Sequence, residues 1–162
     1  MEGGELKTGE AFHGYRIVRL IAAGGMGEVY EAVHEFTGRP VALKVLQLRH
    51  TTKPEAKARA QAEAVVLCRL NHENIVKVHD ANITDHGTVW IAMELLEGGT
   101  LRDVIHHQSP LPVAQALYYA IEIADGIVQA HEINVIHRDL KPENVFVTTQ
   151  HKVKVLDLNA AK

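Results

Sequence analysis

The order of the hydrophobic patterns is the feature that most restricts the fold of this chain. The early part carries short apolar runs bounded by turn residues, as is typical of strands, and apolar residues at helical spacing follow. The predicted strands are three between Tyr15 and Val45, then Val76–Ile83, Val89–Glu94, Val145–Val147 and Val153–Leu156, and the predicted helices are Pro54–Leu70, Leu101–His106 and Pro112–Glu132. Strands first and helices afterwards predict an α+β protein with two lobes hinged near Leu95–Gly98.

Composition limits the class of protein. A chain of 162 residues with 46% apolar content suits one ordinary domain, and a net charge of −3 provides no basic surface for nucleic acid or a polybasic membrane anchor. The single cysteine, Cys68, excludes an internal disulfide and fits a reducing compartment. Met1–Ala11 is polar and lacks the apolar core of a signal peptide, and no apolar run approaches the roughly 20 residues of a membrane helix. We therefore expect a soluble cytoplasmic protein that binds no nucleic acid.

The segment His137–Asn144 carries the strongest chemical signal. It places a carboxylate, a cation and a carboxamide at fixed spacing on a short loop between a long helix and a short strand. Phosphoryl transfer needs such a set: an acceptor for the proton of the nucleophile, a positive charge beside the moving phosphate and an oxygen ligand for a hard metal ion.

With Lys141 two residues after Asp139 and Asn144 five after it, this segment resembles the catalytic loop of the Ser/Thr protein kinases, in particular the bacterial eukaryotic-like branch. The resemblance implies a two-lobe kinase fold with a complete N-lobe, made of a five-stranded antiparallel sheet and one helix, and the first part of a helical C-lobe. The expected divisions are a flexible tail at 1–14, the N-lobe at 15–94, a hinge at 95–98 and a partial C-lobe at 99–162.

The same resemblance assigns roles within the loop. Asp139 corresponds to the base that orients the substrate hydroxyl, Lys141 to the lysine that steadies the γ-phosphate, and Asn144 to a metal ligand. Arg138 corresponds to the arginine that in many kinases binds a phosphorylated activation loop, and His137 to a structural histidine. Lys141 also indicates a Ser/Thr acceptor.

A glycine-rich segment lies between the first two predicted strands. Gly24, Gly25 and Gly27 lack Cβ atoms, so their backbone amides could approach a phosphate closely, although such a segment by itself is more often a tight hairpin turn. Val29 and then Val41–Lys44 follow in the order of the kinase glycine-rich loop and third strand. Ala22 stands where the family has its first glycine, and we expect it to restrict the backbone there.

Lys44 and Glu63 form the next predicted pair. Glu63 shares one helical face with Leu67 and Leu70, and a carboxylate on a core-facing stripe needs a partner. Lys44 is the obvious candidate; the alternatives are a lysine that extends to the surface and an exposed glutamate. In kinases this pair holds the α- and β-phosphates.

Apolar positions suggest where an adenine ring would bind. By resemblance, Met93, Glu94 and Leu96 belong to the gatekeeper and hinge, and Ala42, Val29 and Phe146 correspond to residues that sandwich the ring. Each of the apolar side chains could equally belong to an ordinary core, so their identities alone do not decide between these interpretations.

Asp157-Leu158-Asn159 occupies the place of the kinase Asp-Phe-Gly motif. Asp157 keeps the carboxylate that would bind Mg²⁺, and Leu158 replaces one apolar side chain with another. Asn159 tolerates positive φ better than most residues but less well than glycine, so we expect it to affect metal loading and switching.

The kinase pattern covers Tyr15 to Lys162, which is the end of the sequence. The activation segment, its Ala-Pro-Glu anchor and most of the large lobe would come later, so we expect a fragment or a shortened product. Helix Pro112–Glu132 carries Val113, Leu117, Ala120, Ile121, Ala124, Ile127 and Val128 at helical spacing. Without the later parts this helix should expose a sizeable apolar face, which suggests aggregation or the binding of a partner, either a dimer partner or a missing C-terminal region.

Three functions follow as hypotheses. The first is a protein Ser/Thr kinase that uses ATP and Mg²⁺ and acts on protein substrates. The second is an inactive nucleotide-binding or scaffold module, favoured by Ala22, Asn159 and the short chain. The third is a small-molecule phosphotransferase of related fold, against which Arg138, Lys141 and the Gly-Gly-Met-Gly segment argue.

Overall fold

The structure is a computed structural model that describes residues 6–24, 27–47, 68–84 and 87–157. It divides into two compact units, one made of Met1–Cys68 and Val78–Leu95 and the other of Arg69–Lys77 and Leu96–Lys162. We call these unit 1 and unit 2. The predicted helix Pro54–Leu70, which includes Glu63, lies outside the described residues except for its last positions.

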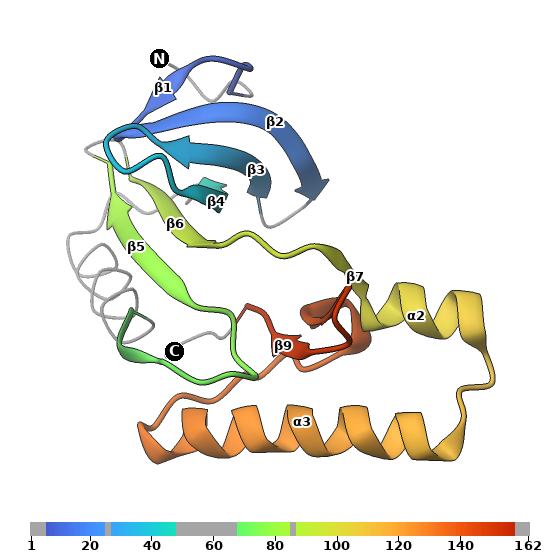
Figure 1. The fold of residues 1–162 in the computed structure, drawn as a ribbon. Coiled ribbons are helices and arrows are strands. Elements are labelled where there is room, and N and C mark those ends of the chain that lie inside the picture. The colour runs from blue at the N-terminus through green and yellow to red at the C-terminus, as the bar shows by residue number, and fades with distance from the viewer. Residues whose placement is uncertain (1–5, 25–26, 48–67, 85–86, 158–162) are drawn as a thin grey trace. The chain divides into compact units, whose positions relative to one another are not determined.

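Unit 1 contains a six-stranded antiparallel sheet in the order β1-β2-β3-β4-β6-β5. Figure 1 shows the strands as a curled sheet with β1 at one edge. Their bounds are β1 Ala11–Phe12, β2 Tyr15–Gly24, β3 Gly27–His34, β4 Pro40–Gln47, β5 Val78–Ile83 and β6 Thr88–Glu94.

The two faces of this sheet differ because side chains alternate along each strand. One face carries the buried core of the unit, formed by Tyr15, Ile17, Tyr30, Ala32, Val41, Leu43, Val45, Trp90 and Ala92. The residues between them, such as Val29 and Lys44, are only half-buried. The sheet therefore has one dry face and one face with accessible side chains.

The predictions of five strands and of a flexible tail through residue 14 need correction. Phe12 pairs with Tyr15 across a two-residue turn in which His13 and Gly14 have φ values of +47° and +86°. Positive φ at both positions is typical of the type I′ hairpin turn, whose twist matches that of paired strands. The segment before the turn is also bonded to β2, since Gly9 N–H donates to Ile17 O at 2.8 Å.

Unit 2 combines two α-helices with a small sheet of order β7-β8-β9 among its described residues. The bounds are β7 Gly98–Thr100, α2 Leu101–Gln108, α3 Val113–Glu132, the 3₁₀ helix η1 Pro142–Asn144, β8 Val145–Thr148 and β9 Val153–Val155. Helix α2 begins at a capping box, in which Thr100 and Asp103 exchange side-chain-to-backbone bonds. Gly98, the last residue of the expected hinge, is the first residue of strand β7 and pairs with Thr148.

Helix α3 presents much of its apolar surface to solvent. Val113, Leu117, Ile121 and Val128 are 76%, 58%, 65% and 56% exposed, whereas Tyr119, Gly126 and Ala130 are buried. The predicted exposed apolar face is confirmed for these four residues. None of the helices in the described part of the chain is long and apolar enough to cross a membrane.

Candidate active site

Three side chains of the loop His137–Asn144 meet in unit 2. The Nζ atom of Lys141 lies 2.7 Å from Oδ2 of Asp139. The Nδ2 atom of Asn144 donates to the backbone oxygen of Asp139 at 2.8 Å and to its Oδ2 at 3.2 Å. The structure thus brings the predicted base, cation and carboxamide together around one carboxylate.

The backbone of this loop is fixed by a buried histidine. His137 is 3% exposed, and its Nε2 lies 2.8 Å from the carbonyl oxygen of Leu156, which only accepts, so Nε2 carries the proton. Asp139 N–H donates to His137 O at 2.9 Å, and the residue between them, Arg138, has a φ of +63°. Non-glycine residues adopt this conformation rarely, which indicates that the surrounding bonds determine the path of the loop. His137 is therefore structural, as predicted.

Asp157 follows Leu156, the residue that is bonded to His137. Leu156 N–H donates to Asn144 O at 2.8 Å, so the chain that leads into Asp157 runs beside Asn144. Asp157 itself has a φ of +53°. The backbone of Leu156 is bonded at its carbonyl oxygen to His137 and at its N–H to Asn144. These two bonds fix the position of the residue that precedes Asp157.

The donor set at Asn144 and Asp157 fits a magnesium ion. Asn144 uses its nitrogen for Asp139, which leaves its carbonyl oxygen Oδ1 as the atom suited to a hard cation, and Asp157 supplies a carboxylate. Within the described ranges no group of three or more His, Cys, Asp or Glu could hold a metal. One carboxylate and one amide are sufficient for Mg²⁺, which usually keeps several water or phosphate ligands.

Charge pairing tunes the ionisation of the loop. The hydrogen bond from Lys141 is the main factor that holds the pKa of Asp139 below its ordinary value, and Asn144 adds to it. The same bond with Asp139 raises the pKa of Lys141, helped by the charges of Glu143 and Asp157. At neutral pH the loop therefore presents an ionised carboxylate beside an ammonium group.

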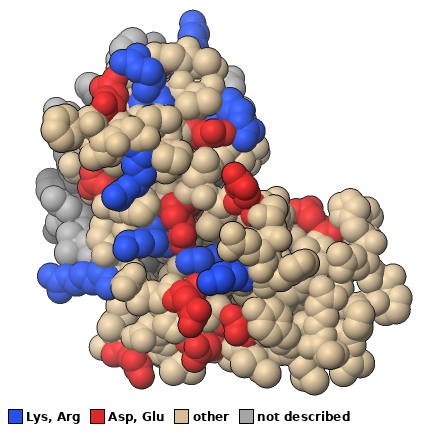
Figure 2. All heavy atoms as spheres, in the orientation of Figure 1, with Lys and Arg blue, Asp and Glu red and all other residues tan. Residues whose placement is uncertain are grey.

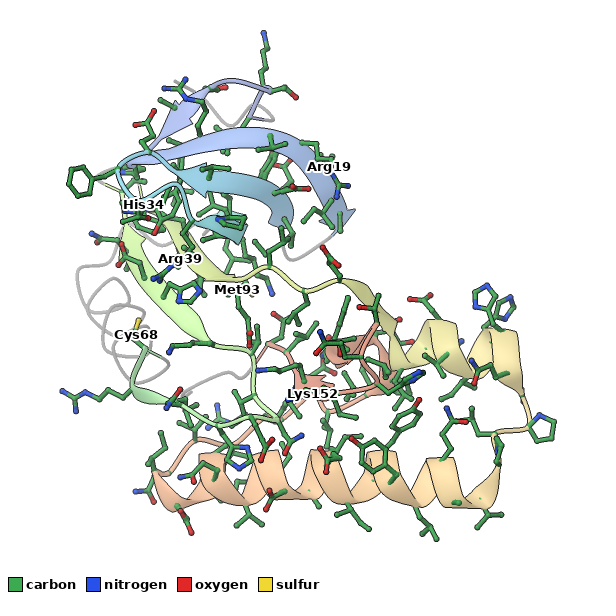
Figure 3. The ribbon with its side chains drawn as sticks, in the orientation of Figure 1. Arg19, His34, Arg39, Cys68, Met93 and Lys152 are labelled. Carbon is green, nitrogen blue, oxygen red and sulfur yellow. The ribbon has the colours of Figure 1, made fainter. Side chains whose placement is uncertain are left out.

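In unit 1, strand register gathers other predicted residues on the accessible face of the sheet. Val29 on β3 lies opposite Lys44 on β4, and Ala42 lies opposite Met93 on β6. All four are half-buried, and Met93 is labelled in Figure 3. Glu94 lies opposite Val41 and so belongs to the other side of the sheet.

The glycine-rich segment is the hairpin turn between β2 and β3. Gly24 pairs with Gly27, and Gly25 lies outside the described residues. Gly27 has a φ of +130°, and a Cβ there would approach Val45 O to 2.2 Å, so only glycine fits. A Cβ on Gly24 would meet nothing within 4 Å. Ala22, inside β2, pairs with Val29 of β3. The expected restriction of the backbone by alanine stays a prediction.

The remaining predicted residues are located as follows. Leu96 belongs to unit 2, and Phe146 is half-buried on β8, where it lies opposite Thr100 and Lys154. Glu63, Leu158 and Asn159 lie outside the described residues. The sequence prediction missed Leu156, because its contribution comes from backbone atoms and has no side-chain signature.

Figure 2 shows acidic and basic side chains interspersed on the face in view, with no extended area of one sign among the residues drawn in colour. Mostly uncharged residues cover the region of α2 and the start of α3.

The fold and the arrangement of the loop define a class of protein that the comparison with known families identifies. The family described as "Protein kinase domain" matches residues 15–162. The chain therefore belongs to the protein kinase domain family.

Its relatives are bacterial Ser/Thr protein kinases. The chain is 39% identical over 152 residues to the serine/threonine-protein kinase PknA of Mycobacterium tuberculosis, with 91% of this chain and 35% of PknA covered. It is 40% identical over 149 residues to the probable serine/threonine-protein kinase PknB of Lactococcus lactis, with 91% of this chain and 24% of PknB covered. The chain thus spans about a third or less of the curated relatives it matches.

Solved structures support the same fold. The crystal structure of the M. tuberculosis PknI kinase domain matches with a TM-score of 0.86 and 33% identity, and the match covers 98% of this chain and 64% of that one. The predicted kinase-like fold with an antiparallel N-lobe sheet is therefore confirmed.

Proposed function

We propose that this chain contributes the nucleotide lobe and catalytic loop of a protein Ser/Thr kinase that transfers the γ-phosphate of ATP, with Mg²⁺, to protein hydroxyl groups. The observation that carries this proposal is the cluster of Lys141 and Asn144 around Asp139, together with the Leu156 bond that leads into Asp157. The names of the curated relatives support it. Because ATP is abundant in the cytoplasm, we place the domain there.

The loop residues have distinct tasks in this proposal. The acceptor hydroxyl oxygen forms the new bond to phosphorus, the bond to the leaving ADP oxygen breaks, and the hydroxyl proton passes to Asp139. The lowered pKa of Asp139 makes it an orienting acceptor that is ionised at neutral pH. Lys141 places positive charge beside the transferred group.

Asn144 and Asp157 would hold magnesium. When bound, the ion would offset the charge of the phosphate oxygens. The bonds from Asn144 Nδ2 to Asp139 keep the amide oriented, so the two functions of the loop share one set of contacts. On the accessible face of the sheet, Lys44 would bind the α- and β-phosphates with Glu63 as its partner. Val29, Ala42, Met93 and Phe146 would contact the adenine ring, with Glu94 and Leu96 supplying hinge backbone groups.

The test is transfer of label from γ-labelled ATP to casein in the presence of Mg²⁺. Asp139→Asn should lower the initial rate by about 10²- to 10⁴-fold, the usual contribution of a positioned base, with an unchanged circular dichroism spectrum. The matched control is Asp125→Asn, the same isosteric change in a carboxylate of α3 that is 65% exposed. Equal rates for the Asp139 variant and the unmodified protein would refute the assigned base.

The same assay separates the alternatives. Faster labelling of a sugar or an aminoglycoside than of casein would indicate a small-molecule phosphotransferase. Binding of ATP without transfer to any acceptor would indicate an inactive nucleotide-binding or scaffold module.

A further inference from the structure

A short segment outside the labelled strands pairs with β9 in unit 2. Val155 N–H donates to Asn74 O at 2.8 Å, and Val76 N–H donates to Val155 O at 2.9 Å. These bonds flank a parallel bridge between Ile75 and Val155. We call residues 72–76 the 72–76 segment. It lies along the edge strand of the small sheet and supplies bonds that this edge would otherwise lack.

The side chain of Asn74 joins the 72–76 segment to helix α3. Its Nδ2 atom donates to Oε2 of Glu122 at 2.7 Å and to the carbonyl oxygen of Val153 at 3.2 Å. Asn74 is 3% exposed. A buried amide that loses its partners costs free energy, and hydrogen bonds to a carboxylate are stronger than those to neutral acceptors. Asn74 therefore links α3, the 72–76 segment and β9 at one point.

Helix α3 comes close to Asn74 because it carries a glycine there. Gly126 is buried in the interior of the helix, where glycine costs about 0.5–1 kcal/mol relative to alanine. A Cβ at this position would lie 3.0 Å from Asn74 O and 3.3 Å from Asn74 Cβ. Any larger residue would thus press the 72–76 segment away from α3, and this close approach accounts for the glycine.

The strand that Asn74 holds leads directly into Asp157. Asn74 is bonded to Val155, and the next residue, Leu156, accepts from Nε2 of His137 at 2.8 Å. Asn74 and His137 are the two buried polar side chains in the described part of the chain. One holds β9 against α3 and the other holds the residue after β9, so together they determine where the backbone enters Asp157.

We infer that Asn74 and Glu122 position Asp157 for magnesium binding through the backbone of β9. This inference rests on the proposed function, in which Asp157 is a ligand of the ion. Asn74 and Glu122 are positioning residues, since their bonds reach β9 and not the proposed ligands. Loss of a group that directly orients a metal ligand usually costs about 10- to 100-fold in affinity. Asn74 acts one step further away, so its effect should be smaller.

The main test is Asn74→Asp, which keeps the shape of the side chain but replaces its donor with an oxygen that faces Glu122. Hydrogen exchange of the Val155 and Leu156 amides, measured by NMR without metal, should become faster. The dissociation constant of Mn²⁺, which takes the same oxygen ligands as Mg²⁺, should rise by about 3- to 10-fold. Electron paramagnetic resonance measures it in the presence of a non-hydrolysable ATP analogue.

The matched control is Asn82→Asp, the same change at an exposed position of β5 in unit 1. Asn82 Oδ1 accepts from Ile83 N–H at 2.8 Å, and a carboxylate can accept the same bond. The control adds the same charge without touching β9. Neither the exchange rates nor the Mn²⁺ dissociation constant should change.

A second substitution tests the bond between the two side chains. Glu122→Gln alone should change the Mn²⁺ dissociation constant by less than about 2-fold, because an amide oxygen can still accept from Asn74 Nδ2. Combined with Asn74→Asp it should recover part of the lost affinity, since the introduced amide can donate to the introduced carboxylate. A merely structural role would instead lower thermal stability without changing Mn²⁺ affinity and without rescue.

Gly126→Ala perturbs the same contact from the side of α3 and keeps the inference testable if Asn74→Asp does not fold. The new Cβ would press on Asn74 O, the acceptor of the Val155 amide. Exchange of that amide should become faster and Mn²⁺ affinity should fall, although alanine is the better helix former.

The outcomes separate this inference from the proposed function. If the unmodified protein binds Mn²⁺ with the analogue and neither Asn74→Asp nor Gly126→Ala weakens this binding, the inference is wrong and the proposed function stands. If binding weakens while the exchange of Val155 and Leu156 is unchanged, the route through β9 is wrong. If the unmodified protein binds no Mn²⁺ with the analogue, the proposed function fails and the inference fails with it.

Discussion

The loop His137–Asn144 of unit 2 and the hairpin turn between β2 and β3 of unit 1 are held in opposite ways. The loop contains no glycine, and its shape depends on side-chain bonds: His137 is bonded to Leu156 O, and Lys141 and Asn144 are bonded to Asp139. The turn depends on the missing Cβ of Gly27, which lets the backbone pass Val45 O. Substitutions in the loop should therefore impair chemistry first, whereas substitutions in the turn should impair stability and binding first.

After Asp139→Asn, the largest effect is expected from Asn144→Ala. The variant loses both bonds to Asp139 and one proposed magnesium ligand, so the kinase rate should fall by about 100-fold or more at saturating ATP. Thermal stability should change little, since Asn144 is only half-buried. Initial rates measured over a range of Mg²⁺ concentrations check this. Full activity of the variant at all magnesium concentrations would show that Asn144 is not part of the proposed site. It would also contradict the expectation that substitutions in the loop impair chemistry first.

Gly27→Ala should have the next largest effect, and it acts on stability. The new Cβ would be forced against Val45 O at a φ of +130°, and we expect a loss of about 2–3 kcal/mol in the free energy of unfolding. Urea denaturation measures it. Gly24→Ala is the matched control, because its Cβ meets nothing within 4 Å and its cost should stay below about 1 kcal/mol. Equal costs at the two glycines would contradict the close backbone approach.

His137→Phe tests whether the loop also depends on a buried bond. The ring volume is nearly kept, but Leu156 O loses its donor, which should lower the free energy of unfolding by about 1–3 kcal/mol. His106→Phe, at an exposed position of α2, should change it by less than about 0.5 kcal/mol. If His137→Phe were as stable as the control, the path of the loop would depend on the other bonds alone.

The ionisation of Asp139 gives a smaller effect that is confined to low pH. Its pKa is lowered mainly by Lys141, so the stability from this pair is present above the ordinary aspartate pKa and is lost as pH falls through the lower, folded value. Lys141→Met should move the pKa of Asp139 back up. A carboxyl ¹³C NMR titration of both proteins measures the shift, and an unchanged pKa would exclude Lys141 as its cause.

The smallest effect is expected at Arg19, which is labelled on β2 in Figure 3. Arg19 pairs with Glu31 across the hairpin at 2.7 Å, but its side chain is 64% exposed. Such pairs contribute at most about 1 kcal/mol and weaken in salt. A double-mutant cycle of Arg19→Ala and Glu31→Ala measures the coupling free energy of the pair. A coupling larger than about 1 kcal/mol would mean that side-chain bonds stabilise the hairpin of the turn as well as the loop.

How far the sequence predicts the site depends on which atoms carry the information. Asp139, Lys141 and Asn144 were predicted from their spacing, since a short loop can bring side chains two and five positions apart to one point. That Val29, Ala42 and Lys44 share a face of the sheet came only from the register of the paired strands. Leu156 and Tyr30 were not anticipated, because the first acts through its backbone and the second through contacts with Leu6 and Glu28 that depend on how the segment before β2 crosses the sheet.

The sequence alone determined the family, the set of side chains in the loop His137–Asn144 and the division into strands followed by helices, because short-range patterns of side chains encode them. Only the tertiary structure decided that Phe12 extends the sheet, that Gly98 begins a strand opposite β8, and that Gly27 requires glycine while Gly24 does not. These features depend on pairing between distant segments. Whether a Cβ is tolerated, or a backbone amide finds a partner, is settled by the atom that the folded chain places opposite it.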